Sequence, residues 1–235
     1  SDAEVLVHLC EEYGDRVLEH VEGMFGFALW DETRARLLLG RDRIGIKPLY
    51  YTRQNDRVAF CSESKALVRR ADVGAALDPE ALEQFLALGY VPNPHSLFAG
   101  VHKLRPGHLA VIENGRLTEH CWWQLEFATR HGRSEQDWID EIDTTLADSV
   151  AAQMISDVPI GAFLSGGIDS SLIIAYMKRA TPQPVRTYSI GYSGSSAADL
   201  YNELPSARQV PDQFGPEHPA TIAEPHAIPL PPNHL

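Results

Sequence analysis

The spacing of apolar residues predicts one helix and then several strands over the first part of the chain. In SDAEVLVHLCEEYG, the pairs Val5/Leu9 and Leu6/Cys10 have helical spacing, and Gly14 stands where a helix would end. Four short apolar and aromatic runs follow, separated by turn-forming residues: MFGFALWD, RLLLGRDR, PLYYTRQ and RVAFCSE. We predict that these four runs form an antiparallel meander.

Two further patterns complete this first region. DPEALEQFLALG has Asp78 as an N-cap, Pro79 in the first turn and Gly89 as a stop, which predicts a helix. In GHLAVIENGRLTEHCWW, the residues Glu113-Asn114-Gly115 separate two strand-like runs, which predicts a β-hairpin. An α+β architecture with antiparallel sheets is therefore expected for residues 1–128.

The pattern changes after a polar stretch at residues 130–134, so we place a domain boundary near residue 128. SEQDWIDEIDTTLADSVAAQM is predicted to be a helix, with one apolar stripe made of Ile139, Ile142, Leu146 and Val150. PIGAFL and VRTYSI are expected to be buried strands, and DSSLIIAYMKRA and NELPSARQ helices. This alternation predicts an α/β region whose parallel sheet is covered on both faces.

Composition narrows the classes of function. The chain has 235 residues, 44% of them hydrophobic and 22% charged, which is typical of a globular protein with room for two domains. Its formal net charge of −12 argues against binding to a nucleic acid backbone. No apolar stretch is long enough for a membrane span and no signal-peptide pattern is present, so we expect a cytoplasmic location without membrane partners.

The three cysteines, Cys10, Cys61 and Cys121, are far apart and form no CxxC pair. A disulfide framework or a zinc site is therefore not expected. We predict three reduced thiols in the core.

The segment GAFLSGGIDSS is the main candidate for chemistry. A buried strand is expected to end at Leu164, with a glycine turn before a helix that starts around Asp169. Such a turn directs free backbone N–H groups and the positive helix end toward an anion, and the serines add hydroxyl donors. Asp169 fits this arrangement if Mg²⁺ accompanies a nucleotide. The alternative is a purely structural turn in which Asp169 and Ser170 only cap the helix.

The same residues also resemble a motif of a known protein family. SGGIDSS resembles the SGGxDS pyrophosphate loop of the ATP pyrophosphatase superfamily, and SDVPIGAFLSGGIDSS resembles the opening of the synthetase domain of glutamine-hydrolysing asparagine synthetases. Upstream, EGMFGFALWD, GRDRIGIKPLYY, SESKAL, LGYVPNP and KLRPGH resemble, in order, the later part of the family's glutamine amidotransferase domain. The resemblance implies that residues 1–128 are the C-terminal portion of an Ntn-hydrolase-like type 2 amidotransferase domain. Residues 129–235 would be the N-terminal portion of a PP-loop synthetase domain.

The resemblance also implies site residues. The ATP-binding set is Phe163, Ser165, Gly166, Gly167, Asp169, Ser170, Ser171 and Ile190, in which Phe163 and Ile190 act through the backbone and Asp169 lies near the metal. Asp2 matches the aspartate that binds the α-amino group of glutamine, with a helix N-cap as the alternative role. Met24 and Ile46 match positions lining an ammonia tunnel, with a plain core role as the alternative.

Several pieces of the family's sites have no counterpart in the sequence. These are the N-terminal cysteine nucleophile, an arginine loop, an Asn-Gly-Glu stretch and the later Ser-Gly-Glu-Gly motif. Ser1 matches a position well inside the domain, and Cys10 lies on the apolar side of its helix, so neither replaces the nucleophile. No catalytic residue is assigned, and residues 1–235 alone are not expected to hydrolyse glutamine. Residues 216–235, which are rich in proline, are interpreted as diverged or loosely ordered.

The function implied by the resemblance is ATP-dependent amide formation with ammonia taken from glutamine. Aspartate would be adenylated with release of pyrophosphate, and ammonia would then displace AMP to give asparagine. The expected ligands are glutamine, ATP, Mg²⁺ and aspartate or a similar carboxylate, and a homodimer is a candidate assembly. Two alternatives stay open: a related amidotransferase that acts on another carboxylate, and a non-catalytic module that binds ATP.

Overall fold

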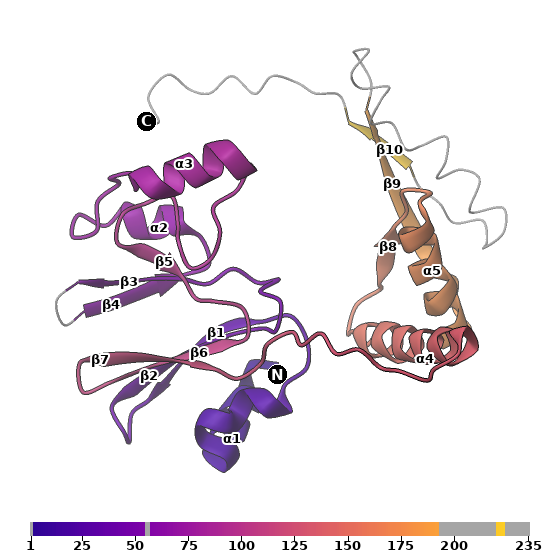
Figure 1. The fold of residues 1–235 in the computed structure, drawn as a ribbon, viewed down its shortest axis with the longest axis horizontal. Coiled ribbons are helices and arrows are strands. Elements are labelled where there is room, and N and C mark those ends of the chain that lie inside the picture. The colour runs from indigo at the N-terminus through magenta and orange to yellow at the C-terminus, as the bar shows by residue number, and fades with distance from the viewer. Residues whose placement is uncertain (1, 55–56, 193–219, 224–235) are drawn as a thin grey trace. The chain divides into compact units, whose positions relative to one another are not determined.

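The computed structural model describes residues 2–54, 57–192 and 220–223, which fall into two compact units (Figure 1). The first unit is Ser1–Ala128 and the second is Thr129–Leu235. None of the helices in the described part of the chain combines the length and the apolar character needed to cross a membrane.

The first unit opens with helix α1 (Asp2–Tyr13), as the sequence predicts. Gly14 takes a positive φ of 59° and begins the 3-10 helix η1 (Gly14–His20), which buries Val17 and Leu18 completely. These two side chains pack on Leu38, Leu109 and Val111 of the adjoining sheet. The predicted first helix is therefore confirmed, and η1 adds a second contact with the core.

Two antiparallel sheets follow, and the predicted single meander is wrong. A four-stranded sheet has the order β1-β2-β6-β7, and a three-stranded sheet has the order β4-β3-β5. Their strands are β1 (Gly26–Asp31), β2 (Arg36–Arg41), β3 (Tyr50–Gln54), β4 (Arg57–Cys61), β5 (Val101–Lys103), β6 (His108–Glu113) and β7 (Arg116–Cys121). β2 pairs with the distant β6, not with β3. The chain thus changes sheets in the segment between β2 and β3.

The two sheets of the first unit enclose a common core. Leu39 and Ala110 of the four-stranded sheet pack against Leu49, Tyr51 and Leu104, which lie in or beside the three-stranded sheet. The four-stranded sheet is therefore covered by α1 and η1 on one face and by the three-stranded sheet on the other. This layering is why β2 is buried along nearly its whole length, including the polar ends Arg36 and Arg41.

Two local predictions in this unit are confirmed. Helix α3 (Pro79–Leu88) is capped by the Asp78 side chain, which accepts hydrogen bonds from two backbone N–H groups, and it ends at Gly89 with a φ of 78°. The β6–β7 hairpin turns at Asn114 and Gly115, with φ values of 49° and 71°. Positive φ at both central residues is the geometry of a type I′ hairpin turn. The five-residue helix α2 (Ser64–Val68) was not predicted from the sequence.

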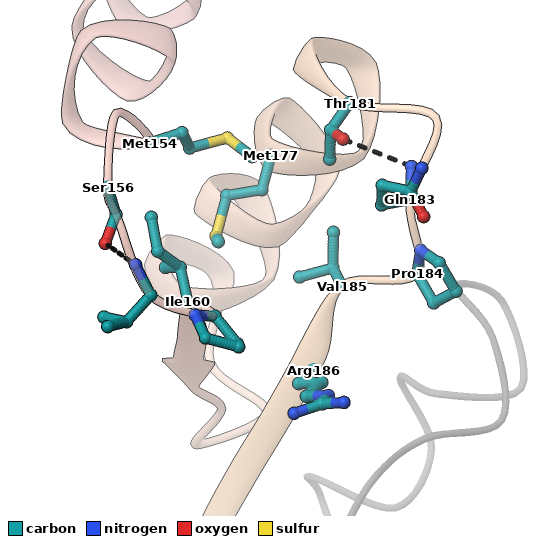
Figure 2. Close-up of a pocket in the computed structure, with 11 residues that line it drawn as sticks. Met154, Ser156, Ile160, Met177, Thr181, Gln183, Pro184, Val185 and Arg186 are labelled. Carbon is teal, nitrogen blue, oxygen red and sulfur yellow. Dashed lines mark hydrogen bonds between the residues drawn. The ribbon is translucent and has the colours of Figure 1, made fainter.

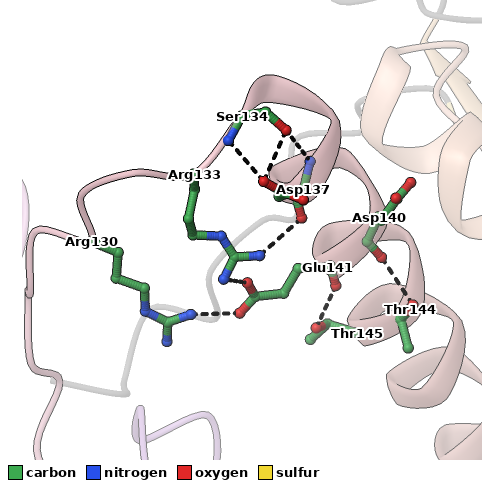
Figure 3. A network of polar contacts seen from close by, with 8 residues as sticks. All are labelled: Arg130, Arg133, Ser134, Asp137, Asp140, Glu141, Thr144 and Thr145. Atoms are coloured by element: carbon green, nitrogen blue, oxygen red, sulfur yellow. Dashed lines mark hydrogen bonds and ion pairs between the residues drawn. The ribbon is translucent and has the colours of Figure 1, made fainter.

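The second unit contains α4 (Glu135–Gln153), β8 (Gly161–Phe163), α5 (Ile168–Ala180), β9 (Arg186–Tyr192) and β10 (Ala220–Ala223). β8 and β10 both pair in parallel with β9. Helix α4 begins with a capping box between Ser134 and Asp137, and Figure 3 shows two arginines of the preceding segment, Arg130 and Arg133, paired with Glu141. The predicted helices over α4 and α5 are therefore confirmed.

The expectation that β8 and β9 are covered on both faces is wrong for the described residues. Thr187 and Ser189 are buried, whereas Phe163 is 74% exposed and Tyr188 is 40% exposed. Strand side chains alternate between two faces, and the described helices cover only one of them. The apolar stripe of α4 is likewise only partly buried, because Val150 packs on Met177 while Ile139 and Ile142 are half exposed.

Two expectations fall on residues that the structure does not describe. The helix expected at NELPSARQ lies outside the described residues. So does most of the segment 216–235, apart from β10.

Candidate functional site

The glycine loop connects the carboxyl end of β8 to the first turn of α5. Just before it, the Leu164 N–H donates to the Tyr188 carbonyl at 2.8 Å, and the Ser189 hydroxyl donates to the Leu164 carbonyl. Gly166 then takes a φ of 83°, which favours glycine, and Gly167 is the N-cap of α5. The loop therefore leaves a strand end that β9 holds in place.

Serine hydroxyls organise the inside of this loop. Ser165 Oγ accepts the Gly167 N–H at 3.3 Å and lies 3.0 Å from Ser170 Oγ. The hydroxyls of Ser170 and Ser171 donate to the Gly167 carbonyl at 3.2 and 2.7 Å. The sequence predicted this set of serines, and the structure brings them together around one turn.

The start of α5 has the features that an anion requires. Gly167 has no side chain to cap the helix, and no side-chain cap hydrogen bond is present at the first N–H groups of α5. A Cβ atom on Gly167 would meet only Ser165 Oγ, at 3.3 Å, so there is open space on that side of the turn. Asp169 lies exposed in the first helical turn, where a carboxylate would repel a bare phosphate but could face a metal ion. The residues present thus fit a phosphate group accompanied by Mg²⁺.

The other residues expected at the ATP site lie on the flanking strands. Phe163 is the last residue of β8 and its side chain is largely exposed. Ile190 lies in β9, paired with Thr221 of β10. Both residues are placed by strand backbone at the sheet edge that leads into the glycine loop.

A hollow of about 400 Å³ lies elsewhere in the second unit, and Figure 2 shows the residues that line it. Its lining includes Met154, Ile160, Met177 and Val185. Ile160 precedes β8 and Val185 precedes β9, so the hollow lies at the amino ends of these strands. It is therefore separate from the glycine loop, which follows the carboxyl end of β8.

In the first unit, the residues expected at the glutamine site and the tunnel lie near one apolar hollow of about 740 Å³. Met24 lines it, together with Leu6 of α1 and the Lys47-Pro48 segment. Asp2 is the first residue of α1, one position before Ala3, which also lines the hollow. Met24 and Ile46 are 49% and 50% exposed, so a plain core role does not fit either side chain.

Sequence reasoning missed the polar pair that holds this region, Arg41 and Asp42. Asp42 is 1% exposed, and its Oδ2 accepts the N–H groups of Phe25 at 3.2 Å and Lys47 at 3.0 Å. Its Oδ1 accepts the Ile46 N–H at 2.9 Å. The signal was present as the Arg-Asp dipeptide inside GRDRIGIKPLYY, next to Gly45 and Pro48.

Arg41 binds the backbone carbonyl groups of the same loop. Its guanidinium donates to the carbonyls of Lys47 and Gly45, each at 2.9 Å, and to that of Leu104. Burial lowers the pKa of Arg41, although the neighbouring Asp42 opposes this effect. The two side chains together bind most of the backbone polar groups of residues 45–47.

The three thiols are free. Cys10 packs against the core of the first unit, and burial raises its pKa, which disfavours the thiolate. Burial also raises the pKa of Cys61, whose Sγ donates to the Glu63 carbonyl at 2.8 Å. Cys121 is exposed, so the prediction that it is a core thiol is wrong; it lies at the end of the outer strand β7.

Two family models match the chain in succession. The model described as glutamine amidotransferase domain matches residues 1–123, and the model described as asparagine synthase matches residues 141–230. The two matches lie on the two compact units of the structure.

Relatives of known name match across both units. Glutamine-hydrolyzing asparagine synthetases 3 and 1 of Bacillus subtilis (strain 168) are 34% and 36% identical, over 93% and 98% of this chain. Amidase chry2 of Gibberella zeae is 31% identical over 92% of the chain. The chain spans only 37%, 39% and 34% of the length of these three relatives. Because the amidotransferase model covers more than half of its residues, the chain belongs to the glutamine amidotransferase domain family, among the members that continue into an asparagine synthase segment.

Proposed function

We propose that this chain works within a glutamine-dependent, amide-forming ligase, most directly one that makes asparagine from aspartate. The observation that carries this proposal is the succession of an amidotransferase match and an asparagine synthase match in one chain. Ammonia released from glutamine at one site is then available to an activated carboxylate at the other.

The glycine loop is assigned to ATP. We assign the pyrophosphate contacts to the N–H groups at the start of α5 and to the hydroxyls of Ser165, Ser170 and Ser171. Backbone atoms of Phe163 and Ile190 contact the nucleoside in this proposal. Mg²⁺ would neutralise phosphate charge beside Asp169. The substrate carboxylate attacks the α-phosphorus, pyrophosphate leaves, and ammonia then displaces AMP from the acyl-adenylate.

The first unit is assigned to glutamine and to the transfer of ammonia. Asp2 is proposed to bind the glutamine α-amino group, and Met24 and Ile46 are proposed to line the passage of ammonia. The half-exposed, apolar side chains of Met24 and Ile46 support this assignment. Such side chains offer at most the weak acceptor of a thioether, and so no strong hydrogen-bonding group that would retain ammonia.

Product analysis tests the reaction in the protein carried to the length of its relatives. Incubation with glutamine, MgATP and aspartate is expected to give asparagine, AMP and pyrophosphate. Formation of ADP and phosphate would contradict the role of the glycine loop, because it would show activation by phosphoryl transfer and not by adenylation.

A second candidate is an amidotransferase that acts on a different carboxylate. The specific observation in its favour is the relative named Amidase chry2, which matches over 92% of the chain under a name other than asparagine synthetase. AMP formed with another carboxylate, but not with aspartate, would favour this candidate.

Binding of MgATP can be measured on residues 1–235 directly by titration calorimetry. We expect weak, Mg²⁺-dependent binding that falls in Asp169→Ala. Asp157→Ala is the matched control, because Asp157 is also an exposed carboxylate but lies before β8. Equal affinity for ATP in wild type and Asp169→Ala, with and without Mg²⁺, would overturn the metal role of Asp169.

A further inference from the structure

Arg41 and Asp42 are two adjacent buried side chains that support an exposed loop, each by hydrogen bonds to its backbone. Both side chains are nearly inaccessible, at 6% and 1% exposure, whereas the Ile46 side chain that they support is 50% exposed. Burying charged groups costs free energy unless hydrogen bonds compensate for it. An exposed isoleucine gains little from burial, so core packing at Ile46 does not account for this pair.

One oxygen atom joins two segments that are distant in the sequence. Oδ2 of Asp42 accepts the N–H of Phe25, which follows Met24, and the N–H of Lys47, which follows Ile46. Oδ1 accepts the N–H of Ile46 itself. The Asp42 side chain therefore ties Met24 and Ile46 to each other, in addition to the backbone bond from the Asp42 N–H to the Phe25 carbonyl at 2.9 Å.

Arg41 and Gly45 fix the other side of the same loop. Gly45 has a φ of 70°, and a Cβ atom there would lie 2.8 Å from Pro106 Cγ and 3.0 Å from Arg41 Cζ. The guanidinium accordingly fits against the loop backbone and binds the carbonyls on both sides of Ile46. The loop has little freedom to move Ile46.

We propose that Arg41 and Asp42 are positioning residues of the ammonia passage, which hold Met24 and Ile46 as its fixed apolar walls. This inference rests on the proposed function, because a passage is needed only if ammonia made at one site is used at another. Arg41 and Asp42 bind backbone groups of this loop, and the side chains of Met24 and Ile46 are half exposed above it. Neither a thioether nor a hydrocarbon side chain can donate a proton to ammonia.

Hydrogen exchange on residues 1–235 tests the positioning itself. Asp42→Asn keeps the size of the side chain but replaces one acceptor oxygen with an NH₂ donor. We expect exchange of the Phe25, Ile46 and Lys47 amides to become roughly tenfold faster or more, since at least one buried N–H loses its acceptor. Asp72→Asn is the control, because Asp72 pairs with Arg70 at the surface of the same unit. Unchanged exchange in Asp42→Asn would overturn the proposal.

The functional consequence is measured in the protein carried to the length of its relatives. With glutamine as nitrogen source, Asp42→Asn is expected to lower the amide formed per glutamate released by roughly threefold or more, because small misplacements in a site are costly. With ammonium chloride, which bypasses the passage, amide formation is expected to stay at the wild-type rate. A merely structural role would lower both together.

A second variant covers the case in which Asp42→Asn fails to fold. Arg41→Lys keeps the charge but loses the planar fork that donates to several carbonyls, and we expect the same fall in amide per glutamate. If Arg41→Lys forms as much amide per glutamate released as the wild type does, the proposal is overturned while the proposed function stays intact. Amide formation in the wild type that is uncoupled from glutamine hydrolysis would overturn both.

Discussion

Two loops of this chain differ in what happens to the backbone N–H groups that follow them. In the first unit, the loop after β2 directs its N–H groups inward, to the carboxylate of Asp42. In the second unit, the loop after β8 leads into α5, whose first N–H groups have no side-chain cap. Donors bound by a buried carboxylate can position other groups, whereas helix-start donors without a side-chain cap can bind an anion.

Each loop also contains a carboxylate whose surroundings follow this difference. Asp42 is buried and accepts three hydrogen bonds from backbone, and Asp169 is exposed beside the open helix end. The same residue type thus supports the fold in one loop and is free to meet a ligand in the other. Substitutions made in matched pairs, one in each loop, test this difference.

The largest effect is expected from removing the two aspartates. Asp42→Ala leaves buried N–H groups without an acceptor and a buried arginine without its neighbour, so we expect a loss of about 3 kcal/mol in the free energy of unfolding. Asp169→Ala removes an exposed carboxylate and should change stability little. Urea unfolding of residues 1–235 measures both. Equal losses in the two variants would show that the loops do not differ as described.

The glycines of the two loops give a smaller contrast. Gly45→Ala requires a positive φ and places a Cβ atom against Pro106 and Arg41, so we expect a loss of about 2 kcal/mol. Gly167→Ala has an ordinary φ of −75° and meets only Ser165 Oγ, so its cost should stay below about 1 kcal/mol. Thermal unfolding is a suitable measurement. A Gly167→Ala variant less stable than Gly45→Ala would contradict the assignment of the rigid loop to the first unit.

The smallest expected effect concerns two tyrosines that donate to carboxylates, one in each unit. Burial, and then the hydrogen bond to Glu119 at 2.6 Å, raises the pKa of Tyr51 far above its ordinary value of 10.0. A raised pKa in the folded state gives a stability contribution that is present below pH 10 and is lost as the pH rises further. We expect a loss of up to about 1 kcal/mol by pH 11, because the unfolded chain ionises first.

The comparison tyrosine is Tyr176, whose pKa is raised chiefly by its hydrogen bond to Asp143. Stability measured between pH 9 and pH 11 in Tyr51→Phe and Tyr176→Phe distinguishes the two. The free energy of unfolding should fall less between pH 9 and pH 11 in Tyr51→Phe than in Tyr176→Phe. The reverse order would mean that burial of Tyr51 does not raise its pKa more than the hydrogen bond to Asp143 raises that of Tyr176.

Elements that depend on local chemistry were predictable from the sequence. Asp78, Pro79 and Gly89 mark the two ends of α3, and Asn114-Gly115 fixes the β6–β7 turn, because each signal acts within a few residues. The cluster of serines and glycines at the start of α5 was predictable for the same reason. Its hydroxyls and N–H groups all lie within one turn.

Strand pairing and burial were not predictable in the same way. Leu39 pairs with Ala110 across the first sheet, and nothing near Leu39 in the sequence specifies that distant partner. Phe163 lies in an apolar run typical of a buried strand, yet its exposure depends on whether a second layer covers that face. Arg41 and Asp42 resemble surface residues by type, and only the turn of the chain at Gly45 explains their burial.

The segment between the two units bears on how such proteins can evolve. The N–H groups of Trp122 and Trp123 donate to the Gly107 carbonyl, which closes the first unit, and Arg130 pairs with Glu141, which opens the second. Between them, Leu125 and Phe127 are 62% and 93% exposed. A gene could be divided within residues 124–129 while both of these anchors are kept. Such a division would leave intact the backbone bonds at the end of the first unit and the ion pair at the start of the second.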